Sequence, residues 1–220
     1  MKPLKLLLFK RFQILSLLTV SMALSIVLLM IRIKIHQSYY LLFLVWNLFL
    51  AVIPYAVTTF LSGLPKLNRY IFALWFGVWL LFLPNAPYIV TDLLHLKNSV
   101  VRLMWLDVLV VTSFAYNGLI LFFLSLRDME RLLKTYLTKQ LVVAGMPLIL
   151  ILSAFGMYLG RFLRYNSWEI VQDPLALAND ILGIIVRPQF EAWVFTFGFA
   201  AFLSIGYWMF KALINKNNAL

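Results

Sequence analysis

The segment LPNAPYIVTDLLHL, residues 83–96, places two prolines and an Asp–His pair inside a chain that is otherwise almost entirely hydrocarbon. A proline removes a backbone hydrogen-bond donor, and lipid offers no water to replace the lost bond. Ionisable side chains at membrane depth are costly as well, so a segment with both features is the first place to look for a functional site. This reasoning holds if the surrounding chain lies in lipid.

The composition indicates an integral membrane protein. Of the 220 residues, 64% are hydrophobic, whereas a soluble domain has roughly 45–50% apolar residues. Cysteine is absent, which excludes disulfides, thiolate metal sites and thiol nucleophiles from this chain. The only histidines are His36 and His95, too few for a site of three imidazoles. We expect an all-α integral membrane protein that forms a single polytopic domain over residues 1–220.

The net charge of +11 raises the question of a nucleic-acid partner. The basic residues lie in short segments between apolar runs, where they orient a membrane protein and contact anionic lipid. We therefore expect the lipid bilayer, and no nucleic acid, as the partner of this chain.

Six apolar runs are long enough to cross a bilayer as helices. The first is about 20 residues long, too long for the hydrophobic part of a signal peptide, so we interpret it as an uncleaved anchor. The predicted spans cover residues 12–31, 40–61, a stretch that begins near residue 70, 103–126, 141–159 and 192–214.

The third span is anomalous because only thirteen residues from Ile71 precede Pro84. As a helix they reach roughly 20 Å, against about 30 Å of hydrocarbon. Either the bilayer is locally thin, or the span continues through the prolines and residues 88–96 form a second half-helix. We favour the second alternative, in which Asn85 satisfies backbone groups that Pro84 and Pro87 leave free. Exposed backbone groups at such a break can form a ligand site.

The distribution of Lys and Arg predicts the orientation. With the N-terminus in the cytoplasm, the inner segments hold 12 of these residues and the outer segments hold 7, including Arg102 and Arg187. Both termini are therefore expected in the cytoplasm, and the broken end of the third span on the outer face. In the long loop after the fifth span, Asp173 can cap an interfacial helix over residues 174–186, with Leu175, Ala178, Leu182 and Ile185 near helical spacing. This helix is either a functional lid or a plain linker.

Ionisable side chains are predicted to converge on an outward-facing pocket. Asp92 and His95, three residues apart, form either a proton relay or an interfacial hydrogen-bonded pair. Asp107 has to pair, protonate or face water, because an unpaired carboxylate within a span costs on the order of 3 kcal/mol. Arg161 and Arg164 pair with these carboxylates, hold an anionic group or reach lipid headgroups. The candidate ligand-binding residues are Asn85, Tyr88, Thr91, Asp92, His95, Asp107, Arg161 and Arg164.

Further predictions concern a deep polar residue, metals and glycines. Asn117 lies near the middle of the fourth span and is expected to form a helix–helix hydrogen bond. We predict no metal site, because a zinc site would need ligands beyond Asp92 and His95. No motif identifies a cofactor or a catalytic residue. Gly118 and Gly145 are interpreted as packing positions.

Two motifs carry a resemblance to a known family. They are FLPNAPYxxTDxxHL at residues 82–96 and YLGRFLRxNSW at residues 158–168. The chain resembles a bacterial family of multi-pass membrane proteins that is known as a domain of unknown function. The resemblance spans most of the chain and implies a protein of the bacterial cytoplasmic membrane. It implies no activity, substrate or catalytic residue.

Three functions stay open. The favoured one is binding or transport of a small anion or lipid headgroup, which the arginines would attract. The first alternative is an intramembrane enzyme acting on an envelope lipid or polyprenyl phosphate, with Asp92 or Asp107 as base and His95 as acid–base partner. Catalysis predicts Asp92, His95 and an arginine within about 3–4 Å of a common point. The second alternative is a non-catalytic scaffold, which predicts that all these polar groups are paired internally.

Overall fold

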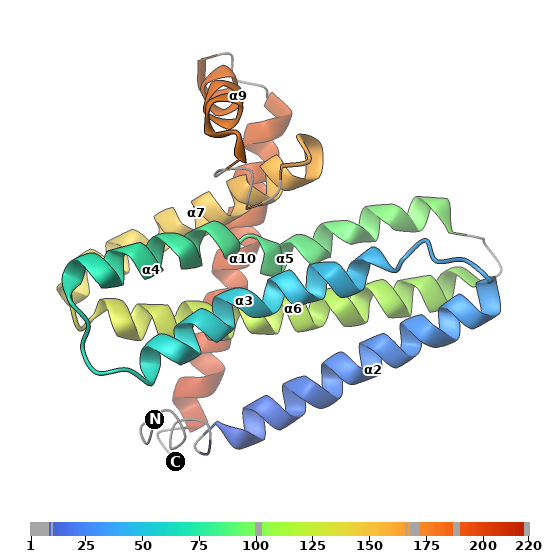
Figure 1. The fold of residues 1–220 in the computed structure, drawn as a ribbon, viewed down its shortest axis with the longest axis horizontal. Helices are drawn as coiled ribbons and strands as arrows, with labels where there is room; N and C mark the ends of the chain where they lie inside the picture. Colours follow the sequence, from blue (N-terminus) through green and yellow to red (C-terminus); the bar gives the residue numbers. More distant parts are fainter. Residues whose placement is uncertain are drawn as a thin grey trace. The chain divides into compact units, whose positions relative to one another are not determined.

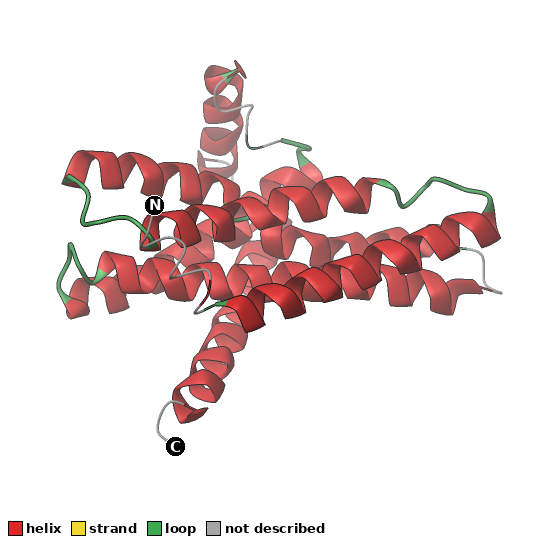
Figure 2. Ribbon diagram, turned by 60° about the horizontal axis from the view of Figure 1, so that its bottom comes forward, coloured by secondary structure: helices red, strands yellow, loops and turns green. Residues whose placement is uncertain are grey.

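A computed structural model of the chain describes residues 9, 11–99, 103–165, 167, 172–186 and 190–217. All secondary structure in these ranges is helical, which confirms the predicted fold class (Figures 1 and 2). The chain forms two compact units, Met1–Leu132 and Leu133–Leu220. A single domain over the whole chain stays a prediction.

Within the described ranges, six helices are long and apolar enough to cross a membrane, as the sequence predicts. The helix that contains the fourth predicted span continues beyond it through the charged residues 127–131. Unit 1 contains α2 (Phe12–His36), α3 (Phe43–Ser62), α4 (Arg69–Phe82), α5 (Asn85–Tyr88), the 3-10 helix η1 (Ile89–Asn98) and α6 (Met104–Leu133), whose last residue belongs to unit 2. Unit 2 contains α7 (Lys139–Phe162), α9 (Pro174–Val186) and α10 (Phe190–Asn217).

The third span continues through the two prolines and changes helix type there. Its helical run Arg69–Lys97 has 29 residues, so the favoured interpretation of this span is confirmed. The second half is a 3-10 helix, which rises about 2.0 Å per residue against about 1.5 Å in an α-helix and so extends the span further.

The local hydrogen bonds show how the prolines interrupt the α-helical pattern between α4 and α5. In an α-helix the carbonyl of Leu83 would accept from residue 87, but Pro87 has no N–H. The N–H of Ala86 donates to Leu83 instead, at 3.3 Å, which deprives the carbonyl of Phe82 of its usual donor. The side chain of Asn85 fills this gap, because its Nδ2 donates to the Phe82 oxygen at 3.0 Å. The predicted role of Asn85 is confirmed, and these carbonyls are bonded within the span.

Gly118 allows the backbone of α6 to approach the α5 turn. A Cβ atom at residue 118 would lie 2.3 Å from the carbonyl oxygen of Ala86 and 3.2 Å from Cδ1 of Ile89. Small residues permit such close helix contacts in membrane proteins. The interpretation of Gly118 as a packing position is confirmed. The same interpretation is wrong for Gly145, because a Cβ atom there would meet no heavy atom within 4 Å.

In unit 2, α7 packs against α10, and α9 packs against both through Ile184, which lies with Tyr158 and Ala192 in one buried cluster. The predicted cap of α9 is confirmed, since the N–H of Ala176 donates to Oδ1 of Asp173 at 3.1 Å. The apolar side chains Leu175, Leu182 and Val186 of α9 are exposed. An exposed apolar stripe on a helix of this length is typical of an interfacial helix.

Candidate functional site

Four polar side chains form a connected row at η1, which we name the η1 relay. Asp92 and His95 come from η1, Asn47 from α3, and Tyr40 from the segment before α3. The amide Nδ2 of Asn47 donates to Oδ2 of Asp92 at 2.9 Å. His95 places Nε2 at 3.9 Å from Oδ1 of Asp92 and Nδ1 at 2.8 Å from the hydroxyl of Tyr40. The ring of Phe43 packs against the imidazole, with the two centroids 4.9 Å apart.

The η1 relay runs from the interior to the surface of unit 1. Asp92 is 1% exposed, the His95 side chain is 31% exposed, and Tyr40 is 38% exposed. A protonated His95 would form an ion pair with Asp92 and donate from Nδ1 to the Tyr40 oxygen. The Tyr40 hydroxyl would then direct its own proton toward another acceptor. The geometry therefore allows a charge change at His95 to reach an exposed hydroxyl.

The side chains of Thr91 and Asn85, two other predicted residues, donate hydrogen bonds to backbone carbonyls three residues earlier. Thr91 donates from Oγ1 to the carbonyl oxygen of Tyr88 at 2.7 Å, and Asn85 donates to Phe82 in the same way. The Asn85 bond lies where α4 is followed by α5, and the Thr91 bond lies where α5 is followed by η1. The structure brings Asn85, Tyr88, Thr91, Asp92 and His95 together on one short helical segment.

Asp107 is paired, and its partner is Arg32 of α2. Arg32 donates from Nε to Oδ1 of Asp107 at 2.8 Å and from Nη2 to Oδ2 at 3.5 Å. The two side chains are 4% and 1% exposed. The Arg32 guanidinium also donates from Nη1 to the carbonyl oxygen of Ser38 at 2.8 Å. The sequence indicated Arg32 only as a charge at the end of the first span, so this pair was not predicted.

Arg161 and Arg164 lie in unit 2, at the end of α7. Their grouping with the residues of unit 1 in one pocket stays a prediction. Arg164 has a φ of 61°, in the left-handed region, where the last turn of α7 closes with a hydrogen bond from the N–H of Tyr165 to the carbonyl of Leu159. Glycine is the usual residue at such a position. Asn166 and Trp168, at the end of the second motif, lie outside the described residues, as do Arg102 and Arg187.

We expect Arg164→Gly to increase the stability of the protein by roughly 0.5–1 kcal/mol, because glycine adopts the left-handed conformation without steric cost. Arg164→Ala keeps the strain and should give no such gain. Unfolding by SDS in mixed micelles would measure both variants. Equal stabilities of the Gly and Ala variants would contradict the prediction.

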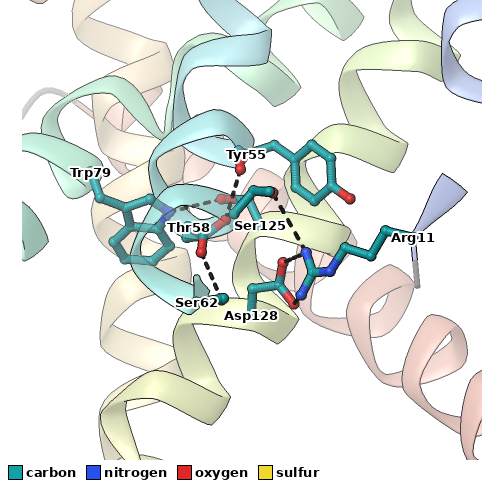
Figure 3. A network of polar contacts seen from close by, with 8 residues as sticks. Arg11, Tyr55, Thr58, Ser62, Trp79, Ser125 and Asp128 are labelled. Carbon is teal, nitrogen blue, oxygen red and sulfur yellow. Dashed lines mark hydrogen bonds and ion pairs between the residues drawn. The ribbon is translucent and has the colours of Figure 1, made fainter. Parts of the chain in front are cut away.

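A second buried network lies where α2 begins, as Figure 3 shows. Arg11 binds the carboxylate of Asp128 with both terminal nitrogens and contacts Thr59 Oγ1 at 3.5 Å. Burial by itself would lower the pKa of the Arg11 guanidinium, but its hydrogen bonds and the charge of Asp128 outweigh burial and raise the pKa above its ordinary value. On the neighbouring helices, Trp79 Nε1 donates to Ser125 Oγ at 2.8 Å.

The polar contacts between α2 and α6 follow one antiparallel register. Arg32 lies 21 residues after Arg11, and Asp128 lies 21 residues after Asp107, so the two ion pairs are equally spaced on both helices. This spacing corresponds to roughly 31 Å along a helix, about the thickness of the hydrocarbon core. The separation of the two pairs along the helices thus matches the thickness of that core.

Between the two ion pairs, Asn117 donates from Nδ2 to Ser25 Oγ of α2 at 3.0 Å and to the Ser113 carbonyl at 2.9 Å. The prediction of a helix–helix hydrogen bond at Asn117 is confirmed. Such bonds contribute about 0.6 kcal/mol on average in membrane proteins.

The residues that the sequence reasoning missed are mainly the partners of the predicted ones. Asn47 could have been recognised from the sequence, because an amide side chain within the second apolar run needs a hydrogen-bond partner in lipid. Tyr40 and Arg32 gave no such signal, because residues of these types are common at the ends of spans. In the described part of the chain, no three His, Asp or Glu side chains lie close enough together to hold a metal ion.

Comparison of the chain with curated proteins and with solved structures finds no match. A protein family does match, over residues 46–205, from α3 to α10. The matched region contains Asp107 and all residues of the η1 relay except Tyr40. The chain therefore belongs to the family described as "Protein of unknown function (DUF1361)", a family of unknown function whose member here has six helices able to span a membrane.

Proposed function

We propose that this membrane protein binds a small anion or a lipid headgroup on the outer face of the membrane, at the exposed end of the η1 relay. The observation that carries the proposal is the contact of the partly exposed His95 with both Tyr40 and the buried Asp92. An imidazole held from two sides by polar partners and packed on Phe43 is already oriented for a ligand. Anionic oxygens accept hydrogen bonds from hydroxyl and imidazolium groups. A ligand with an anionic oxygen therefore suits the exposed end of the relay.

The proposed location is the bacterial cytoplasmic membrane with both termini in the cytoplasm. The excess of Lys and Arg in the segments on that side supports the orientation. The arrangement would place Tyr40 and His95 near the outer leaflet, within reach of lipid headgroups as well as of soluble anions.

The test is the amount of phospholipid and phosphate that remains with the purified protein, measured by native mass spectrometry. We expect Tyr40→Phe to lower the bound fraction severalfold, because it removes the hydroxyl and keeps the ring that packs against His95. Tyr39→Phe is the matched control, since Tyr39 is the adjacent tyrosine and is 72% exposed. His95→Ala should lower the bound fraction as well.

Equal ligand retention by wild type, Tyr40→Phe and His95→Ala would overturn the proposal. Inorganic phosphate and vesicles of anionic phospholipid, added separately to delipidated protein, distinguish the two sources of the anionic group. Binding of phosphate alone indicates a soluble anion, whereas binding that requires vesicles indicates a headgroup.

The scaffold function has one specific observation in its favour. Asp92, Asp107, Asn85 and Thr91 all hydrogen-bond within the protein, as helix-locking residues would. A loss of stability in His95→Ala with no ligand bound to the wild type would support that function. The enzyme function gains less support, because Arg32, the arginine bonded to the buried carboxylate of α6, already holds both Asp107 and Ser38.

A further inference from the structure

We infer that Arg32 is a positioning residue for the exposed end of the η1 relay, and that it acts through the short segment of residues 37–42. This inference rests on the proposed function, because it concerns the same site. It assigns to the buried Arg32–Asp107 pair a role beyond holding α2 against α6.

The contacts form one continuous path. Arg32 bonds at once to Asp107 on α6 and to the Ser38 carbonyl in the segment after α2. Two residues later, the N–H of Tyr40 donates to Ser38 Oγ at 3.3 Å, and the Tyr40 hydroxyl reaches His95 on η1 at 2.8 Å. The segment is thus fixed to α6 at one end and to η1 at the other. A displacement of Ser38 would move Tyr40 directly.

The start of this segment is also constrained. Gln37 follows α2 with a φ of 50°, in the left-handed region, and its side chain donates from Nε2 to the Lys34 carbonyl at 2.7 Å. The chain therefore turns sharply between Arg32 and Tyr40. In a short, sharp turn few dihedral angles can absorb a shift of Ser38. A shift of Ser38 therefore displaces Tyr40 more than it would in a long flexible loop.

Only arginine supplies all these bonds from one side chain. Its planar guanidinium presents donors in fixed directions, so Nε and Nη2 can face a carboxylate while Nη1 faces a carbonyl. Lysine would keep the charge next to Asp107, but a single ammonium cannot hold both partners in this geometry. Arg32→Lys is therefore the variant that separates charge compensation from positioning.

The chain offers a matched control at the other end of the same two helices. Arg11 pairs with Asp128 as Arg32 pairs with Asp107, but the described partners of Arg11 lie on α3 and α6 rather than in residues 37–42. Arg11→Lys therefore perturbs an equivalent ion pair without touching the relay. Both variants are to be made in the full chain, reconstituted in bilayer nanodiscs.

The main readout is the nitrogen NMR spectrum of the imidazoles, which reports hydrogen bonding and tautomer without any ligand. The chain contains two histidines, so His36→Gln assigns the His95 signals. We expect Arg32→Lys to shift the His95 Nδ1 resonance in the same direction as Tyr40→Phe, and Arg11→Lys to leave it unchanged. The chain has no cysteine, so Tyr39→Cys provides a single site for a spin label. The label should become more mobile when Arg32→Lys is added, and it should keep its mobility when Arg11→Lys is added.

Ligand retention gives the second readout. We expect Arg32→Lys to reduce it to the level of Tyr40→Phe, and the double variant to show no further loss, because both act on the same hydroxyl. An unchanged His95 signal in Arg32→Lys, or the same change in Arg11→Lys, would overturn the inference. If the NMR result holds and the wild type retains no ligand, the positioning inference stands and the proposed function fails.

Discussion

Asp107→Leu is expected to destabilise the protein by about 3–5 kcal/mol, because it leaves the guanidinium of Arg32 buried without its counter-charge. Water offers little compensation at this position, since the Arg32 side chain is only 4% exposed. Asp107→Asn should cost less, because an amide oxygen still accepts a hydrogen bond from Nε. SDS unfolding in mixed micelles would measure both variants against the wild type.

The double variant Arg32→Met with Asp107→Leu is expected to recover most of the lost stability, because both charges of the pair are removed together. Its recovery would distinguish an uncompensated charge from a simple packing defect. Asp180→Asn is a suitable control, since Asp180 is exposed and its described hydrogen bond is to Tyr165. A stability of Asp107→Leu equal to that of this control would contradict the existence of the buried pair.

The same double variant separates stability from function. It should fold, and yet it lacks the bond from Arg32 to the Ser38 carbonyl that holds residues 37–42 in place. A stable protein with an altered His95 signal would show that the ion pair serves the relay as well as the fold. A structural role alone predicts that stability and the His95 signal recover together.

The spans were predictable because hydropathy is a local property of the chain. The cap of α9 at Asp173 and the compensating role of Asn85 were predictable for the same reason, since each depends on neighbours within four residues. The change from α5 to η1 was not foreseen. The interruption at the prolines was predictable, but it lies between α4 and α5, before the 3-10 helix begins.

The long-range pairs were beyond sequence reasoning. Arg32 and Asp107 are 75 residues apart, and Arg11 and Asp128 are 117 residues apart, so no local pattern connects them. Their equal spacing of 21 residues on two spans was visible in the sequence. It becomes informative only when α2 and α6 are known to be antiparallel neighbours. The pairing of the η1 relay with Tyr40 depends in the same way on the path of residues 37–42.

Gly118→Ala is expected to cause the second large effect. The new methyl group would need to occupy a point 2.3 Å from the carbonyl oxygen of Ala86, far inside van der Waals contact. Because the obstacle is backbone, no rotamer change can relieve it, and α6 or the α5 turn has to move. Overpacking of this kind costs roughly 1–3 kcal/mol or more.

The displacement should also reach the relay, since Ala86 and Asp92 lie on the same continuous helical run. We therefore expect Gly118→Ala to lower both the stability and the fraction of retained ligand. Gly77→Ala and Gly145→Ala are matched controls, because an added Cβ meets no heavy atom within 4 Å at either position. Each control should be neutral or stabilising by roughly 0.5–1 kcal/mol, as alanine restricts the unfolded chain more than glycine does. A Gly118→Ala variant as stable as these controls would show that the helices do not meet at this point.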